Sequence, residues 1–206
     1  ANSSLSVRFI DGSQVLLLKD STLKLDNLTA YPNTGMANTQ LKLETGRVET
    51  QVKPLKGAAS RYEIRTPMAQ LGVRGTDFRV GADTSSNTGS TEVLSGAVQA
   101  ENDAGAVDVQ QGFGSVIALG KPPSPPIELL PAPDLSTIPA LIERTPIRFR
   151  WQPMAAASGY RVQIERDKQF NVVLDEDVFV TPEASFPDLP DGQYAMRVRA
   201  IDTHGL

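Results

Sequence analysis

The sequence predicts an all-β protein of two domains: a β-sandwich or solenoid-like domain followed by a small immunoglobulin-like β-sandwich. Three observations predict this fold class. Apolar residues alternate with polar ones, turn signals recur at short spacing, and a proline-rich stretch divides the chain. The 206 residues are 40% hydrophobic and 21% charged, a balance typical of a globular protein.

Alternation places the strands of the first domain, because a strand with one buried face repeats every second residue. The alternating segments are residues 5–9, 41–43, 48–52, 62–64 and 78–80. Gly, Asn, Asp and Pro between these segments predict turns. The turn signals are Asp11-Gly12, Pro32-Asn33, Thr45-Gly46, residues 87–89, Ser95-Gly96 and residues 103–105.

A run of prolines predicts the domain boundary. Four of the six residues 121–126 are proline, and Pro131 and Pro133 follow. Proline has no backbone donor and a fixed φ, so this stretch is not a central strand and is expected to be a stiff linker. We therefore expect a β domain over residues 1–120, a linker over residues 121–135 and a second β module over residues 136–206.

The second module alternates again over residues 147–151, 160–164 and 194–201. Trp151 early in the module and Tyr194 at the start of its long late strand favour an immunoglobulin-like or fibronectin type III sandwich. The sequence ends at Leu206, where a last edge strand is expected. The module is therefore interpreted as truncated, or as completed by a strand supplied in another way.

Residues 64–80 also carry a family resemblance. Ile64-Arg65-Thr66-Pro67 and Gly72-Val73-Arg74-Gly75-Thr76-Asp77-Phe78-Arg79-Val80, with the later segments 92–98 and 109–114, resemble the FecR family over about residues 5–119. The family's best-known members are inner-membrane regulators whose periplasmic part senses an outer-membrane receptor and whose cytoplasmic start controls a sigma factor. The present sequence has neither that cytoplasmic region nor a membrane segment.

The arrangement looks more like soluble envelope proteins of the LysM/FecR type, which join a FecR domain to fibronectin-like modules. A LysM domain, if it exists, is expected before residue 1. The resemblance implies the bacterial cell envelope, in the periplasm or otherwise exported. It leaves a role in sigma-factor signalling open.

The signature segment has two interpretations. In the first it is architecture: Thr66-Pro67 is extended, Gly75 marks a bulge or bend where no side chain fits, and Arg74 pairs with Asp77 or with buried carbonyls. In the second it is a partner-binding surface that includes Arg74, Asp77 and Arg79. The residue pattern favours the first.

Catalytic patterns are not found in the sequence. It contains no Cys and one His, His204, near its end, so a zinc site or a serine–histidine–aspartate triad is not expected. Neither a nucleophile elbow nor a phosphate loop occurs. We therefore expect a protein that is not an enzyme and has no cofactor or metal. The acidic run Asp175-Glu176-Asp177 is expected to be a solvated loop, with a weak calcium site as the alternative.

Charge and aromatic content limit the partners. The net charge is −4 without a basic stripe, so nucleic acid is not expected, and no apolar run of about 18 residues predicts a membrane span. The predicted function is a protein-interaction, scaffold or signal-sensing module, with an envelope protein or peptidoglycan as partner. The alternative is a carbohydrate-binding or peptidoglycan-binding module, for which Phe149, Trp151, Tyr160 and Tyr194 would form a stacking platform instead of a core. The oligomeric state stays open.

Overall fold

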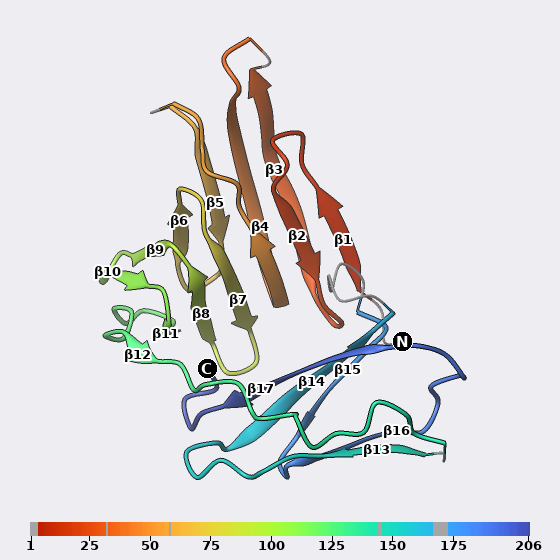
Figure 1. The fold of residues 1–206 in the computed structure, drawn as a ribbon. Helices are drawn as coiled ribbons and strands as arrows, with labels where there is room; N and C mark the ends of the chain where they lie inside the picture. The colour runs from red at the N-terminus through yellow and green to blue at the C-terminus, as the bar shows by residue number, and fades with distance from the viewer. Residues whose placement is uncertain (1–3, 32, 58, 144–145, 167–172) are drawn as a thin grey trace. The chain divides into compact units, whose positions relative to one another are not determined.

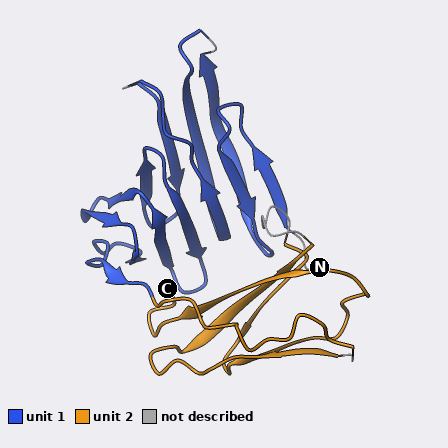
Figure 2. Cartoon of the chain, viewed as in Figure 1, with its two compact units in different colours: residues 1, 3–129, 206 blue, residues 2, 130–205 orange. Residues whose placement is uncertain are grey.

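The computed structural model describes residues 4–206 except 32, 58, 144–145 and 167–172. The described residues form strands and connecting segments without a helix, as the sequence predicts (Figure 1). The chain divides into two compact units, one over residues 3–129 and one over residues 130–205 (Figure 2). The expected boundaries at residues 120 and 135 remain predictions.

Unit 1 is a curled 12-stranded sheet in two halves. Half I has the strand order β3–β4–β5–β6–β9–β10, and half II has the order β1–β2–β4–β7–β8–β11–β12. Neighbouring strands are antiparallel except β4 and β5, which are parallel. The bounds are β1 Leu5–Arg8, β2 Gln14–Leu17, β3 Thr22–Tyr31, β4 Met36–Gln51, β5 Arg61–Arg65, β6 Gln70–Val73, β7 Asp77–Asp83, β8 Thr88–Ser95, β9 Ala97–Asn102, β10 Gly105–Gln110, β11 Phe113–Ala118 and β12 Ile127–Glu128.

The apolar residues that alternate in the sequence form one core between the two halves. Half I contributes residues such as Leu41 and Ile64, and half II contributes residues such as Val48, Phe78 and Val80, all at most 1% exposed. The alternation therefore predicted correctly which face of these strands is buried.

Strand β4 belongs to both halves. Its residues 36–45 pair with β3 or β5, and residues 46–51 pair with β2 or β7. The turn expected at Thr45-Gly46 was wrong, because the chain bends there without reversing. Gly46 has φ +92°, and a Cβ on it would clash with the Oγ, Cα and Cβ of Ser21. The Ser21 hydroxyl also accepts a 2.8 Å hydrogen bond from the Arg47 N–H, so the bend packs directly on the turn before β3.

The chain then passes between the halves at a series of corners. It crosses after β4 at residues 52–60, after β6 at residues 74–76, after β8 at Gly96 and after β10 at residues 111–112. Backbone hydrogen bonds join successive corners: the Val52 N–H donates to the Thr76 carbonyl at 3.0 Å, and the Gln111 N–H donates to the Gly96 carbonyl at 3.0 Å. We call this set of four crossings the corner stack.

Residues 121–129, expected to belong to a linker, pack on unit 1. Strand β12 pairs with β11. The Ser124 hydroxyl accepts a 3.0 Å hydrogen bond from the Val116 N–H, and its carbonyl accepts one of 2.9 Å from the Ser115 hydroxyl. These contacts tie the first part of the proline run to the sheet of unit 1.

Unit 2 consists of a two-stranded sheet, β13–β16, and a three-stranded sheet, β15–β14–β17, all antiparallel. Their bounds are β13 Ile147–Arg150, β14 Gly159–Glu165, β15 Asp175–Phe179, β16 Glu183–Phe186 and β17 Ala195–Ile201. The core between them includes Trp151, Tyr160 and Phe186, each at most 5% exposed. The sequence also contains the apolar run Val172-Val173-Leu174, and Val172 lies outside the described residues.

We predict that Gly46→Ala lowers the free energy of unfolding by at least about 2 kcal/mol, since it combines a left-handed backbone with a direct clash on Ser21. Gly112→Ala is the matched control, because Gly112 has φ +83° and a Cβ added to it would meet no atom within 4 Å. Urea denaturation measures the free energy of unfolding of both variants, and the difference between their losses gives the contribution of the clash. Equal losses in the two variants would contradict the packing of the bend on Ser21.

The β7–β8 hairpin gives a pH prediction. The Ser85 hydroxyl and N–H and the Ser86 hydroxyl donate to the Asp83 carboxylate, with the Ser85 hydroxyl at 2.6 Å, and these bonds lower the pKa of Asp83 from 3.8 to about 2. Because the folded pKa is depressed, the stabilisation is present above pH 3.8 and is lost as the pH falls through about 2. Ser85→Ala should move the NMR titration midpoint of Asp83 upward. A midpoint near 3.8 in the unmodified chain would contradict these bonds.

Candidate functional site

The signature segment begins with a hairpin turn. Residues 66–69 connect β5 to β6, and the Thr66 N–H donates to the Ala69 carbonyl at 2.8 Å. The Thr66 hydroxyl accepts hydrogen bonds from the Met68 and Ala69 N–H groups at 3.2 and 3.0 Å. Thr66 therefore closes the turn with its backbone and its side chain, so its place in the signature has a local structural reason.

Gly75 lies in the corner stack. Its φ is +117°, and a Cβ on it would lie 2.8 Å from the Pro54 Cα. On the next corner, a Cβ on Gly96 would lie 2.8 Å from the Gly75 carbonyl oxygen. The Thr76 hydroxyl donates to the Ala97 carbonyl at 2.9 Å. The bend expected at Gly75 is confirmed, and its cause is the close approach of three chain segments.

Arg79 lies within an ion-pair cluster on the face of the sheet opposite Phe78. Its Nη1 is 2.9 Å from the Glu92 Oε2, and the Arg47 Nη2 is 2.8 Å from the Glu92 Oε1. The Arg79 Nε is 3.9 Å from the Glu49 Oε1. Register explains the cluster, because Arg79 on β7 stands directly opposite Glu49 on β4 and Glu92 on β8. Its side chain is only 11% exposed, so its charge is used within the chain.

The other two residues of the expected binding surface are placed differently. Arg74 is exposed and precedes the corner at Gly75. Asp77 begins β7 and accepts a long hydrogen bond of 3.5 Å from the Gln51 amide. The pairing of Asp77 with Arg74 stays a prediction. Asp77 and Arg79 share one face of β7, and Arg74 lies outside the strand. A binding role for these three residues stays a prediction.

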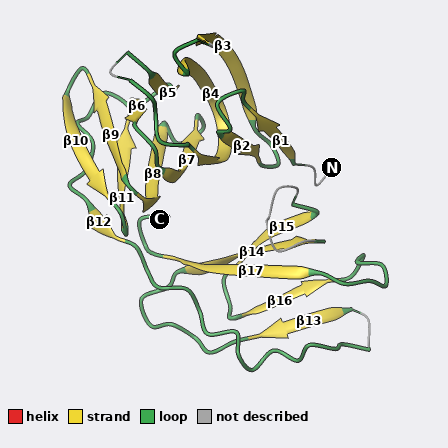
Figure 3. Cartoon of the chain, turned by 45° about the horizontal axis from the view of Figure 1, so that its top comes forward, coloured by secondary structure: helices red, strands yellow, loops and turns green. Residues whose placement is uncertain are grey.

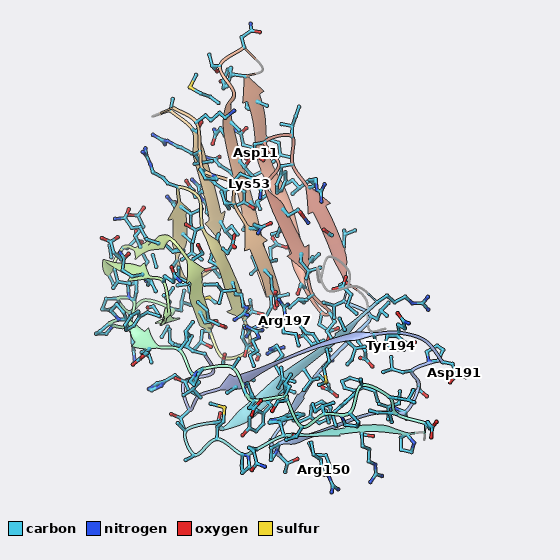
Figure 4. All side chains as sticks on the ribbon, in the orientation of Figure 1. Asp11, Lys53, Arg150, Asp191, Tyr194 and Arg197 are labelled. Carbon is cyan, nitrogen blue, oxygen red and sulfur yellow. The ribbon has the colours of Figure 1, made fainter. Side chains whose placement is uncertain are left out.

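The structure contains a groove in unit 1 that the sequence reasoning missed. The groove has a volume of about 300 Å³ and lies between the β1–β2 turn, the β3–β4 hairpin and the chain after β4. Asp11 and Lys53, labelled in Figure 4, both line it, and a Cβ on Gly12 would lie 3.6 Å from the Lys53 Cγ. Its full lining is Ile10, Asp11, Ala30, Tyr31, Gly35, Met36, Ala37, Lys53, Pro54, Leu55, Lys56 and Ser60.

Two sequence signals point to this groove in retrospect. Ile10 and Tyr31 are apolar or aromatic residues beside turns, where they are 83% and 53% exposed. Lys53 and Lys56 flank Pro54. Neither signal is specific by itself, because Ile10 and Lys53 are brought together only by the pairing of β1, β2 and β4.

The acidic run of unit 2 is not a loop, so this expectation was wrong. Asp175, Glu176 and Asp177 lie in strand β15, and Glu176 is only 4% exposed. Its carboxylate pairs with Arg161 at 2.5 Å and accepts a hydrogen bond from Gln163 at 2.5 Å. Among the residues that the structure describes, no group of three or more acidic or His side chains is arranged to hold a metal ion.

The four aromatic residues considered as a stacking platform lie in or against the core of unit 2. Trp151 and Tyr160 are in T-shaped contact, with ring centroids 5.3 Å apart, and are 5% and 3% exposed. Phe149 and Tyr194 pack against the same cluster, and the Tyr194 hydroxyl donates to the Pro190 carbonyl at 2.7 Å. These contacts support a core role over a sugar-stacking platform.

His204 is the single histidine of the sequence. Its side chain is 57% exposed, and its Nδ1 lies 3.1 Å from the Asp202 Oδ2. The pair sits beside a turn that follows β17, where the Gly205 N–H bonds to the Asp202 carbonyl.

Comparison with known proteins supports the family resemblance. The family model described as FecR protein matches residues 1–99, slightly less than half of the chain. No curated protein sequence matches the chain. In the described part of the chain, no helix is long and apolar enough to cross a membrane.

Two solved structures are similar to part of the chain. Both are described as a putative anti-sigma factor from Parabacteroides distasonis, with 16% and 17% sequence identity and TM-scores of 0.49 and 0.48. Each match covers 58% of this chain and 52% of the other, so the chain spans about half the length of these proteins.

We predict that Arg79→Met lowers the free energy of unfolding by about 2–4 kcal/mol, because Glu92, 4% exposed, loses one of its ion-pair partners. Adding Glu92→Met should recover part of this loss. Lys24→Met is the control, since the side chains of Lys24 and its partner Glu44 are 58% and 33% exposed, so the loss of this exposed pair should cost much less. Denaturant titration of the variants measures each value. Equal losses for Arg79→Met and Lys24→Met would contradict a structural role for Arg79.

Proposed function

We propose that this chain is a non-enzymatic signal-sensing module of the bacterial cell envelope, which acts by binding another envelope protein through its FecR-type domain. The observation that carries the proposal is the family match over residues 1–99, since this match covers most of unit 1. FecR-type proteins are regulatory. Exported location and an envelope protein as partner are parts of the proposal.

The geometry of unit 1 fits a rigid binding module. The signature residues have structural roles, because Gly75 lies at a close approach within the corner stack and Arg79 forms ion pairs within the sheet. Surface features elsewhere, such as the groove at Lys53, are then available for contact. A binding module needs a scaffold that keeps its shape while loops and strand edges contact the partner.

In the same proposal unit 2 is a fibronectin-like or immunoglobulin-like spacer. Two small antiparallel sheets enclose Trp151, and the bond from Tyr194 to the Pro190 carbonyl resembles the tyrosine corner of such sandwiches. The burial of Trp151 and Tyr160 gives no support to the alternative of a carbohydrate-binding or peptidoglycan-binding module.

The test uses the full chain, residues 1–206, as immobilised bait against solubilised envelope of its own bacterium, with purified peptidoglycan tested by cosedimentation. We expect one envelope protein to be retained in stoichiometric amount by folded bait and not by heat-unfolded bait. Cosedimentation with peptidoglycan, without a retained protein, would contradict the proposal in favour of the alternative.

A further inference from the structure

Strand β3 presents a free edge. Among the described strands it pairs only with β4, at the end of half I (Figure 3). A strand edge with unpaired backbone groups is a ready template for another extended chain. Proteins protect such edges with charges or bulges, so it matters where those features lie along β3.

A bulge divides β3 into two parts. The register shifts between Leu25 and Asn27, and the charged residues Lys24 and Asp26 lie at or before this shift. After it, residues 27–31 pair with β4 without interruption and contain no charged residue. The protective features are therefore confined to one part, and a regular five-residue edge remains beyond them.

The inner face of this edge is apolar and half uncovered. Leu28 stands opposite Thr39, and Ala30 stands opposite Ala37, two residues of β4 that are 4% and 7% exposed. Side chains directly opposite each other lie on the same face of a sheet, so Leu28 and Ala30 point to the core side. Leu28 is nevertheless 49% exposed. At this edge the core side of half I is therefore partly open to solvent.

The edge leads into the groove. Ala30 and Tyr31, the last residues of β3, line it together with Lys53 and Lys56. The Lys56 side chain lies over Gly35, where a Cβ on the glycine would be 3.9 Å from the Lys56 Nζ. Neither lysine ammonium forms an ion pair with any residue that the structure describes.

The groove's single carboxylate is already used. The Asp11 Oδ1 accepts the Ser13 N–H at 2.9 Å, and its Oδ2 accepts the Ser13 hydroxyl at 3.0 Å. The Asp11 carboxylate therefore holds its own turn. With Lys53, Lys56 and Asp11, the groove has a formal net charge of +1 beside an apolar strip. This is complementary to a chain that carries both apolar and acidic residues.

We propose that residues 27–31 of β3 and the Lys53–Lys56 groove together bind an extended peptide segment of a partner protein. The segment would add as a strand to the β3 edge, place an apolar side chain against Leu28 and direct an Asp or Glu to Lys53 and Lys56. A second copy of this chain fits less well, because residues 27–31 offer no carboxylate to the lysines. The inference rests on the proposed function and specifies its contact surface.

The test is selection of short random linear peptides, displayed as a library, on the immobilised full chain. We expect the selected peptides to combine apolar residues in alternation with an acidic residue near one end. Their affinity should fall at least about tenfold for Lys53→Glu/Lys56→Glu and for Leu28→Asp, since the first repels the acid and the second removes the apolar contact. Circular dichroism and melting temperature confirm that each variant folds.

Control variants carry a Lys→Glu or a Leu→Asp substitution outside the β3 edge and the Lys53–Lys56 groove. Lys121→Glu and Leu119→Asp alter exposed residues of unit 1 away from β3, and both should bind the selected peptides like the unmodified chain. The inference is overturned if no peptide is selected, if the controls lose as much affinity as the groove variants, or if sedimentation shows a dimer that Leu28→Asp dissociates. If an envelope protein is retained equally by the groove variants, the proposed function stands and this surface is wrong.

Discussion

Unit 1 depends on the close stacking of its corners. The chain crosses between the two halves of the sheet four times after β4, and the crossings are close enough that Gly75 and Gly96 leave no room for a side chain. Hydrogen bonds from Val52 to Thr76 and from Gln111 to Gly96 join the corners along the stack. Each strand pair is therefore held at its end as well as along its length, and the two halves share one core.

This constraint explains the signature without reference to a partner. Thr66 closes the hairpin that precedes the corner, Gly75 permits the close approach of Pro54, and Arg79 pairs with Glu92 just after it. A sequence signature of this kind identifies a scaffold. The contact surface inferred at β3 uses residues outside the signature. Residues 27–31 lie outside the corners, whereas Lys53 and Lys56 belong to the first corner and would contribute their side chains.

Sequence alone predicted the strand faces well. Leu41, Ile64 and Val80 alternate with polar residues, and they are buried because a pleated strand has only two faces. Prediction from the sequence failed where the local structure depends on contacts between segments far apart in the chain. Thr45-Gly46 has the composition of a turn, yet β4 continues through it. The chain bends there because Gly46 packs directly against Ser21.

In the candidate site, too, local features were predicted from the sequence and contacts between distant segments were not. The bend at Gly75 was predicted from its local pattern, but its contact with Pro54 was not. Glu176 was expected in a loop because three acidic residues in a row favour solvent; its pairing with Arg161 across β14 and β15 stabilises a strand instead. The Lys53–Lys56 groove needs the register of β2 on β4, which periodicity does not give.

Native-state hydrogen exchange on residues 1–206 tests the role of the corner stack most directly. The informative amides are those of Val52 and Gln111, which donate across successive corners. The structure predicts that they exchange with the same free energy as the amides of Val80 and Val93 in the central strands, since corners and strands unfold together. Exchange at the fast rates of ordinary exposed loops would show that the corners are not structural, and would contradict this account.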